Sequence, residues 1–168
     1  MKKETFCRYI RQYETDMFRF AKGIVGTQAD GEDAMQESIL KAYENIDTLR
    51  SRRKFKAWIF QILANQILRN RKRQEPTDPF EFPEQEHSSD YWTEDMVSED
   101  GEILSYILRM PKQHQEVLIL YYYDEFSTKE IAKILDIPQG TVKSRLARGR
   151  KQLKDLLEME GEGAYEGA

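Results

Sequence analysis

Basic and small side chains share one side of the segment at residues 137–153, IPQGTVKSRLARGRKQL. At about 100° per residue, a helix here would turn four residues outward, namely Ser144, Ala147, Arg148 and Lys151. Its flanks would carry Thr141, Lys143, Arg145 and Arg150. Small outward residues permit close approach to a DNA major groove, and flanking cations can reach phosphates on either side. The arrangement favours DNA binding over the alternative, a basic face that only meets water.

The preceding residues predict how this basic helix is held. The sequence STKE forms a capping box, in which Ser127 caps the amide of Glu130 and Glu130 reaches back to Ser127. A short helix then ends at Leu135, and a break at residues 136–140 separates it from the basic helix, which runs to about Glu158. The inward side of the basic helix would carry Val142, Leu146, Gly149 and Leu153. Two short helices joined by a tight turn predict a helix-turn-helix.

A second basic segment, residues 50–74, combines cations with large aromatic side chains. Its helix, from about residue 53 to 74, would have a core face of Phe55, Trp58, Ile59, Ile62, Leu63 and Ile67. Cations at a helix C-terminus suit the helix dipole, but here they gather at both ends, which the dipole does not explain. Phe55 and Trp58 could stack on exposed bases or simply fill the core, and both interpretations stay open.

Two further helices are predicted before this segment and two after residue 102. The first runs over residues 3–24, and the second begins after Asp30 as N-cap and ends near Ile46. The inward side of the second would carry Met35, Ile39, Ala42, Tyr43 and Ile46. Residues 103–109 and 112–123 form the later pair. The predicted fold class is all-α.

Charge is divided into blocks that indicate the domain organisation. Residues 1–74 carry a net charge of +7, residues 75–102 carry −11 without a single cation, and residues 103–168 carry 0. The acidic block contains three prolines and no helical period, which predicts a flexible linker. We therefore expect two small helical domains, 1–74 and 103–158, and a disordered tail at 159–168. The linker aromatics would either fold back on a domain or dock on a partner: Phe80, Phe82, Tyr91 and Trp92.

Composition argues against several classes of protein. The longest apolar stretches fall far short of the roughly 20 residues that cross a bilayer, and no signal peptide is visible. The single cysteine, Cys7, fits a reduced cytoplasmic setting. Only two histidines occur, His87 and His114, and no phosphate-binding glycine loop, metal cluster or nucleophile arrangement accompanies them. We expect no enzyme activity, no catalytic residue, no metal, no cofactor and no small-molecule substrate.

Three segments resemble the extracytoplasmic-function (ECF) sigma factors of bacterial RNA polymerase: DGEDAMQESILKAYENI, FKAWIFQILANQ and EIAKILDIPQGTVKSRLARGRKQL. The likeness covers residues 5–158. It implies an alternative sigma factor that binds core RNA polymerase, recognises the −35 and −10 promoter elements and serves a stress or envelope-response regulon. It also implies a cytoplasmic protein that an anti-sigma factor holds inactive.

The resemblance also implies roles for individual residues. Polymerase binding would fall to Asp33, Gln36, Glu37, Lys41 and Tyr43, although a solvated amphipathic surface explains these residues equally well. Recognition of the −10 element would fall to Arg50, Lys56, Trp58, Gln61, Asn65 and Arg69, with Asn65 holding a flipped base rather than pointing to water. Recognition of the −35 element would fall to Thr141, Lys143, Ser144, Arg145, Ala147, Arg148 and Lys151.

A helix-turn-helix activator that does not replace the sigma subunit is the alternative. It would explain residues 127–157, but neither the basic, aromatic helix before the linker nor the acidic linker.

Overall fold

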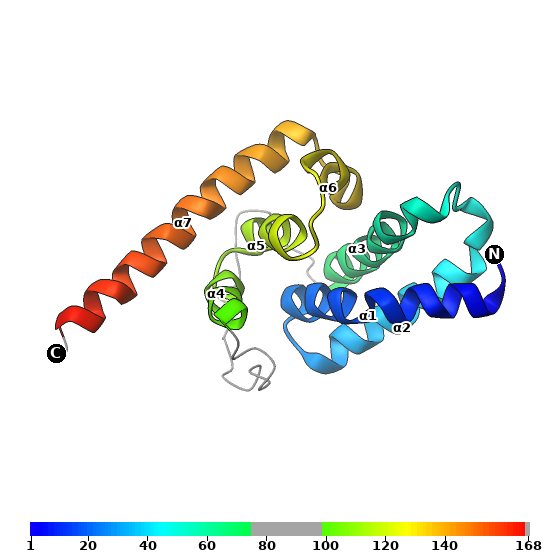
Figure 1. Cartoon of the computed structure of the whole chain (residues 1–168), viewed down its shortest axis with the longest axis horizontal. Helices are drawn as coiled ribbons and strands as arrows, with labels where there is room; N and C mark the ends of the chain where they lie inside the picture. The colour runs from blue at the N-terminus through cyan, green and yellow to red at the C-terminus, as the bar shows by residue number, and fades with distance from the viewer. Residues whose placement is uncertain (75–98, 167–168) are drawn as a thin grey trace. The chain divides into compact units, whose positions relative to one another are not determined.

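The computed structural model describes the backbone of residues 1–74 and 99–166 and the side chains of residues 1–70 and 102–161. The described residues are helical with short connections and contain no strand. They form two compact units, which are described separately below. The first contains α1, α2 and α3, and the second contains α4, α5, the start of α6 and α7 (Figure 1). The all-α prediction is confirmed, whereas the predicted linker lies almost wholly outside the described residues.

The first two helices, α1 (Lys3–Val25) and α2 (Gln28–Glu44), are joined by a very short turn. Gly26 adopts a left-handed conformation, with φ of 85°, and its N–H donates to Lys22 O at 2.9 Å. The N-cap of α2 is Thr27, whose Oγ1 accepts from the N–H of Asp30 at 3.1 Å. The prediction of Asp30 as N-cap is therefore wrong, because Gly26 turns the chain early enough for the helix to start at Gln28.

The inward face of α2 also differs from the prediction. Its buried residues are Gly31, Ala34, Ser38 and Ala42, of which Ala42 alone was predicted to face inward. A Cβ at position 31 would lie 3.2 Å from the Cα of Lys22, so α1 and α2 approach too closely for large side chains between them. The larger apolar residues are displaced outward: Met35 and Ile39 are half-buried, and Tyr43 is 47% exposed.

Two short 3₁₀ turns, η1 (Ile46–Thr48) and η2 (Arg52–Lys54), lead into α3 (Phe55–Gln74). The core face of α3 holds Phe55, Ile59, Phe60, Leu63, Ala64 and Ile67. Phe55 is 1% exposed and stacks on Tyr9, with ring centroids 5.0 Å apart. The interpretation of Phe55 as a stacking surface for bases is therefore wrong, because α1 already covers its ring. Trp58 and Ile62 are only half-buried.

The second unit begins with α4 (Glu99–Leu108) and α5 (Lys112–Leu118), and α5 continues into a π-helical turn, η5 (Ile119–Tyr123). The helices α6 (Thr128–Leu135) and α7 (Gln139–Glu166) follow. α7 packs along α5 and also contacts α4. The apolar interior includes Leu104, Ile107, Val117, Leu118, Leu120, Val142 and Leu146.

Both ends of this unit extend beyond the predicted boundaries. α4 begins at Glu99, inside the predicted linker, and α7 runs to Glu166, through the predicted disordered tail. Contacts with α4 and with the residue that follows it explain the extension of α7. The Tyr106 hydroxyl of α4 donates to Glu160, and Arg109 Nη1 lies 3.4 Å from the same carboxylate. These partners are more than 50 positions away in sequence, so local pattern does not reveal them.

Candidate DNA-binding and partner-binding surfaces

The outward face of α7 has the composition that its sequence predicts. Ser144, Ala147, Arg148 and Lys151 are exposed, as is Lys143, whereas Thr141 and Arg145 on the flanks are half-buried. On the opposite side, Val142 is fully buried, Leu146 is 2% exposed and Gly149 is buried. The helix therefore presents a small and basic surface that is backed by a packed apolar one, which suits a helix that enters a major groove.

Hydrogen bonds at the start of α6 fix the helix-turn-helix. Ser127 Oγ accepts from the N–H of Glu130 at 3.1 Å, so the N-cap half of the predicted capping box is present. The Glu130 carboxylate reaches back to Ser127 as predicted, but it accepts from the Ser127 hydroxyl at 3.2 Å. Asp136 takes a positive φ of 52° in the turn, a conformation that aspartate tolerates better than most residues. Gln139 Nε2 then donates to Thr128 Oγ1 at 2.9 Å, which ties the first residue of α7 to the first residue of α6.

Gly149 allows α7 to pack closely against α5. A Cβ at position 149 would lie 3.1 Å from Leu118 Cδ1 and 3.4 Å from His114 Cβ. One turn away, His114 Nδ1 and Gln152 Oε1 form a hydrogen bond of 2.5 Å between the same two helices. The outward face of α7 is therefore held at a fixed rotation by both apolar and polar contacts with α5.

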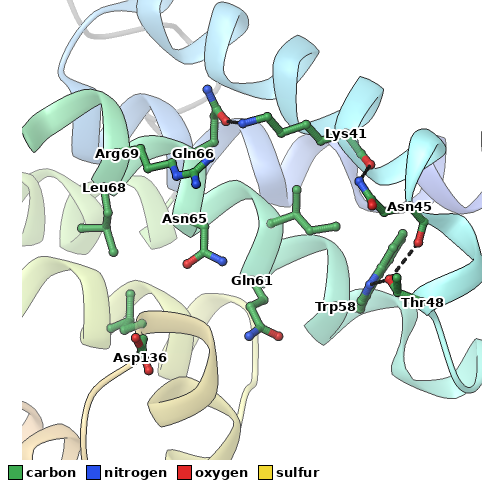
Figure 2. A pocket seen from close by; sticks show the side chains of 12 residues that line it. Lys41, Asn45, Thr48, Trp58, Gln61, Asn65, Gln66, Leu68, Arg69 and Asp136 are labelled. Atoms are coloured by element: carbon green, nitrogen blue, oxygen red, sulfur yellow. Dashed lines mark hydrogen bonds between the residues drawn. The ribbon is translucent and has the colours of Figure 1, made fainter. Parts of the chain in front are cut away.

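Four of the residues predicted to read the −10 element share one side of α3. Figure 2 shows Trp58, Gln61, Asn65 and Arg69 along that side, close to Lys41, Asn45 and Thr48. Gln61, Asn65 and Arg69 are exposed, so their polar atoms can meet another molecule. The two other predicted residues do not line this surface: Arg50 is exposed in the connection before η2, and the Nζ of Lys56 lies 5.9 Å from the ring centroid of Tyr13.

Trp58 is anchored by a chain of hydrogen bonds that local pattern could not predict. Its Nε1 donates to Thr48 Oγ1 at 3.2 Å, and Thr48 Oγ1 donates to the carbonyl of Asn45 at 2.7 Å. Asn45 Nδ2 in turn donates to the carbonyl of Lys41 at 2.8 Å (Figure 2). These hydrogen bonds fix η1 against α3, and the half-buried indole lines the same pocket as Gln61 and Asn65.

The predicted polymerase-binding residues lie on the outer side of α2. Asp33 and Gln36 are exposed, Lys41 is half-buried, and Tyr43 packs its ring edge-on against Phe6 at 5.4 Å. Glu37 is also exposed, but it accepts a hydrogen bond from Gln66 of α3. Glu37 is therefore engaged in part within the protein, and Gln66 is a residue at this surface that the sequence interpretation missed.

Comparison with known proteins assigns both units to one family. Residues 9–77 match the family model for sigma-70 region 2, and residues 100–153 match the one for sigma-70, region 4. Over 171 residues the chain is 31% identical to the ECF RNA polymerase sigma factor SigW of Bacillus subtilis, with 92% of this chain and 91% of SigW covered. The chain belongs to the ECF sigma factors.

Other relatives of this ECF sigma factor agree with that assignment. It is 29% identical over 156 residues to the RNA polymerase sigma factor SigV of Bacillus subtilis, with 90% of each chain covered. Among solved structures, it resembles the sigma factor RpoE of Bartonella quintana, crystallised with the anti-sigma factor NepR. The TM-score is 0.67 at 26% identity, over 92% of this chain and 98% of that one. CnrH, solved with the cytosolic domain of CnrY, shares the fold at a TM-score of 0.65 and 20% identity, over 94% of this chain and 90% of CnrH.

The match to region 2 falls on the unit of α1–α3, and the match to region 4 falls on α4–α7. Sigma factors are DNA-binding regulators of transcription rather than a family of enzymes, and this chain is an alternative sigma factor. In the part of the chain that the structure describes, no helix is both long enough and apolar enough to span a membrane. No group of three or more potential metal ligands occurs within those same residues.

Proposed function

We propose that this ECF sigma factor binds core RNA polymerase through the outer side of α2 and reads promoter DNA with two separate surfaces. α3 would bind the opened −10 element, and the outward face of α7 would bind the −35 element. Residues 1–74 would thus serve polymerase and the −10 element, residues 75–102 would connect the domains, and residues 103–158 would serve the −35 element. The protein would act in the cytoplasm, without catalysis of its own and without a cofactor.

The observation that carries the proposal is the outward face of α7. Arg148 and Lys151 are exposed there beside Ser144 and Ala147, over a buried face that the capping box and Gly149 hold in place. Arginine can form paired hydrogen bonds with guanine, and small neighbours let the helix backbone approach the base edges. The anchored indole of Trp58 and the exposed amide of Asn65 support single-strand binding on α3, since stacking and edge hydrogen bonds both hold an unpaired base.

The outer side of α2 supports the polymerase assignment. Tyr43 is 47% exposed and Leu40 is 65% exposed, beside the acidic and amide side chains of Asp33 and Gln36. Exposed large apolar residues among polar ones are typical of a protein-binding surface. By analogy with the RpoE–NepR complex, an anti-sigma factor that competes for these surfaces would keep the protein inactive. The regulon would then be one that responds to stress or to damage of the cell envelope.

Two measurements on the purified full-length chain test the proposal. The first is stable binding to core RNA polymerase, read by co-elution and by competition with another sigma factor. The second is transcription in vitro by the reconstituted holoenzyme on a genomic DNA library, with mapping of the start sites. The proposal expects start sites that share −35 and −10 sequences. A helix-turn-helix activator would bind core polymerase weakly and would produce transcripts only when another sigma factor is added.

A further inference from the structure

Gln66 connects α3 to two oppositely charged residues of α2. Its Nε2 donates to Glu37 Oε2, and its Oε1 accepts from Lys41 Nζ. Gln66 is only 7% exposed, so its amide depends on these two partners for hydrogen bonds. Figure 2 shows the bond between Gln66 and Lys41. The charges also fix the orientation of the amide, since the opposite orientation would place its NH₂ group against the ammonium.

Glu37 and Lys41 lie four residues apart on α2, with the acid first, which is the favourable order for a direct ion pair. The amide of Gln66 stands between them instead, and among the described residues no ion pair joins the two. Each keeps hydrogen-bonding capacity for another molecule. Glu37 is exposed and has a second carboxylate oxygen, and the half-buried Lys41 ammonium has two more donors.

We propose that Gln66 is a positioning residue for polymerase binding. It holds the Glu37 carboxylate and the Lys41 ammonium in fixed rotamers on the side of α2 that meets the polymerase. This role rests on the proposed function of that surface. Ordering a long side chain at an interface costs a factor of about 2 to 13 in affinity, and a side chain that is already ordered avoids most of that cost.

If the hydrogen bonds of Gln66 served only to stabilise the fold, their loss would not change polymerase affinity and thermal stability separately. Removing one partner of a hydrogen bond is costly for folding mainly when the other partner stays buried and unsatisfied. Glu37 is exposed and Lys41 is half-buried, so both can bind water once the Gln66 amide is gone. Loss of the amide leaves Glu37 and Lys41 without their shared partner, so it frees both side chains to rotate. Polymerase affinity and thermal stability therefore respond differently to the loss of the Gln66 amide.

The test uses Gln66→Met in the full-length chain, because methionine has similar length and no strong hydrogen-bonding group. We expect affinity for core polymerase to fall about 5- to 100-fold, with a thermal unfolding transition close to that of the wild type. Gln12→Met is the matched control, since Gln12 is exposed on α1, and its affinity should equal that of the wild type. Gln66→Leu serves in the same assay if the methionine variant unfolds early.

A thermodynamic cycle decides whether Gln66 acts through Glu37 and Lys41. In a chain that already carries Glu37→Ala and Lys41→Ala, Gln66→Met should cause no further loss of polymerase affinity. An equal loss in both backgrounds, or no loss in the wild-type background, would overturn the positioning role. Failure of the proposed function is a different result: the wild-type chain would then not bind core polymerase at all.

Discussion

Arg148 and Arg150 are two positions apart on α7, yet they face different surroundings. Both side chains are exposed, but Arg148 lies on the outward side and Arg150 Nε donates to the Tyr122 hydroxyl at 2.6 Å. The guanidinium of Arg150 also lies 5.3 Å and 5.6 Å from the ring centroids of Tyr121 and Tyr122. The tyrosines of η5 thus hold one of the four predicted flanking residues against the protein, whereas Arg148 lies on the face that we propose to bind the −35 element.

If Arg148 reads a base edge as proposed, Arg148→Ala should weaken binding to a good promoter by about 1–3 kcal/mol, because its bidentate contact would be lost. The loss should shrink on promoters that are altered at the contacted base. Lys151→Ala should weaken all promoters alike, since a phosphate contact carries no sequence information. Binding of holoenzyme to a set of −35 variants measures both effects. An equal, uniform loss for the two variants would contradict direct reading by Arg148.

Arg150→Met should lower the stability of the second unit by about 1 kcal/mol, through loss of an exposed cation–π contact and a hydrogen bond. Thermal unfolding measures the change. Tyr122→Phe is the control, because it removes the hydroxyl and keeps the ring, and it should cost less. A promoter-binding defect with unchanged stability would show that Arg150 contacts DNA directly.

Asn65→Ala should keep polymerase binding and −35 contact but lower the formation of open complexes on duplex promoters. The variant lacks the amide that would hold an unpaired base, and unpairing costs a few kcal/mol. A template that is already melted at the −10 element should recover part of the loss. Permanganate footprinting of unpaired thymines on both templates measures the opening. Opening at the wild-type level would mean that Asn65 only points to solvent and holds no base.

Gly31→Ala should destabilise the first unit by about 1–3 kcal/mol, although alanine favours helix. The added Cβ would meet the backbone of Lys22, whose Cα and N lie 3.2 and 3.3 Å away and cannot rotate aside. Gly140→Ala is the control for helix propensity, because a Cβ there has nothing within 4 Å. Denaturant unfolding compares the two. Stabilisation by both substitutions would mean that α1 and α2 separate easily.

The contact between Tyr106 and Glu160 should make the end of α7 sensitive to alkaline pH. The hydrogen bond to the Glu160 carboxylate is the main cause that raises the pKa of Tyr106 above its usual value of 10.0. The contribution to stability is therefore complete below pH 10 and is lost as the pH rises through the pKa of the folded state. Glu160→Gln should lower the pKa of Tyr106, as read by tyrosinate absorbance with Tyr106→Phe subtracted. An unchanged titration would contradict the contact.

Local pattern was sufficient to predict α7 and the capping interaction at the start of the preceding helix. The alternation of Val142, Leu146 and Gly149 with exposed basic residues follows the helical period, and the N-cap bond between Ser127 and Glu130 lies within four residues. These features depend on neighbours a few positions away, so the sequence alone determines which side of α7 is outward. The all-α class follows for the same reason.

Tertiary structure decided the features that depend on distant partners. The buried side of α2 is set by how closely α1 approaches, and Gly31 allows that approach, so small residues face inward in place of the predicted large ones. The hydrogen bond from Gln66 to Glu37 joins positions 29 residues apart, and the hydrogen bond from Arg150 to Tyr122 joins positions 28 residues apart. A helical period reports only which side of a helix is apolar. The shape and the polar atoms of the packed neighbour determine which side is buried and which charges remain available to a partner.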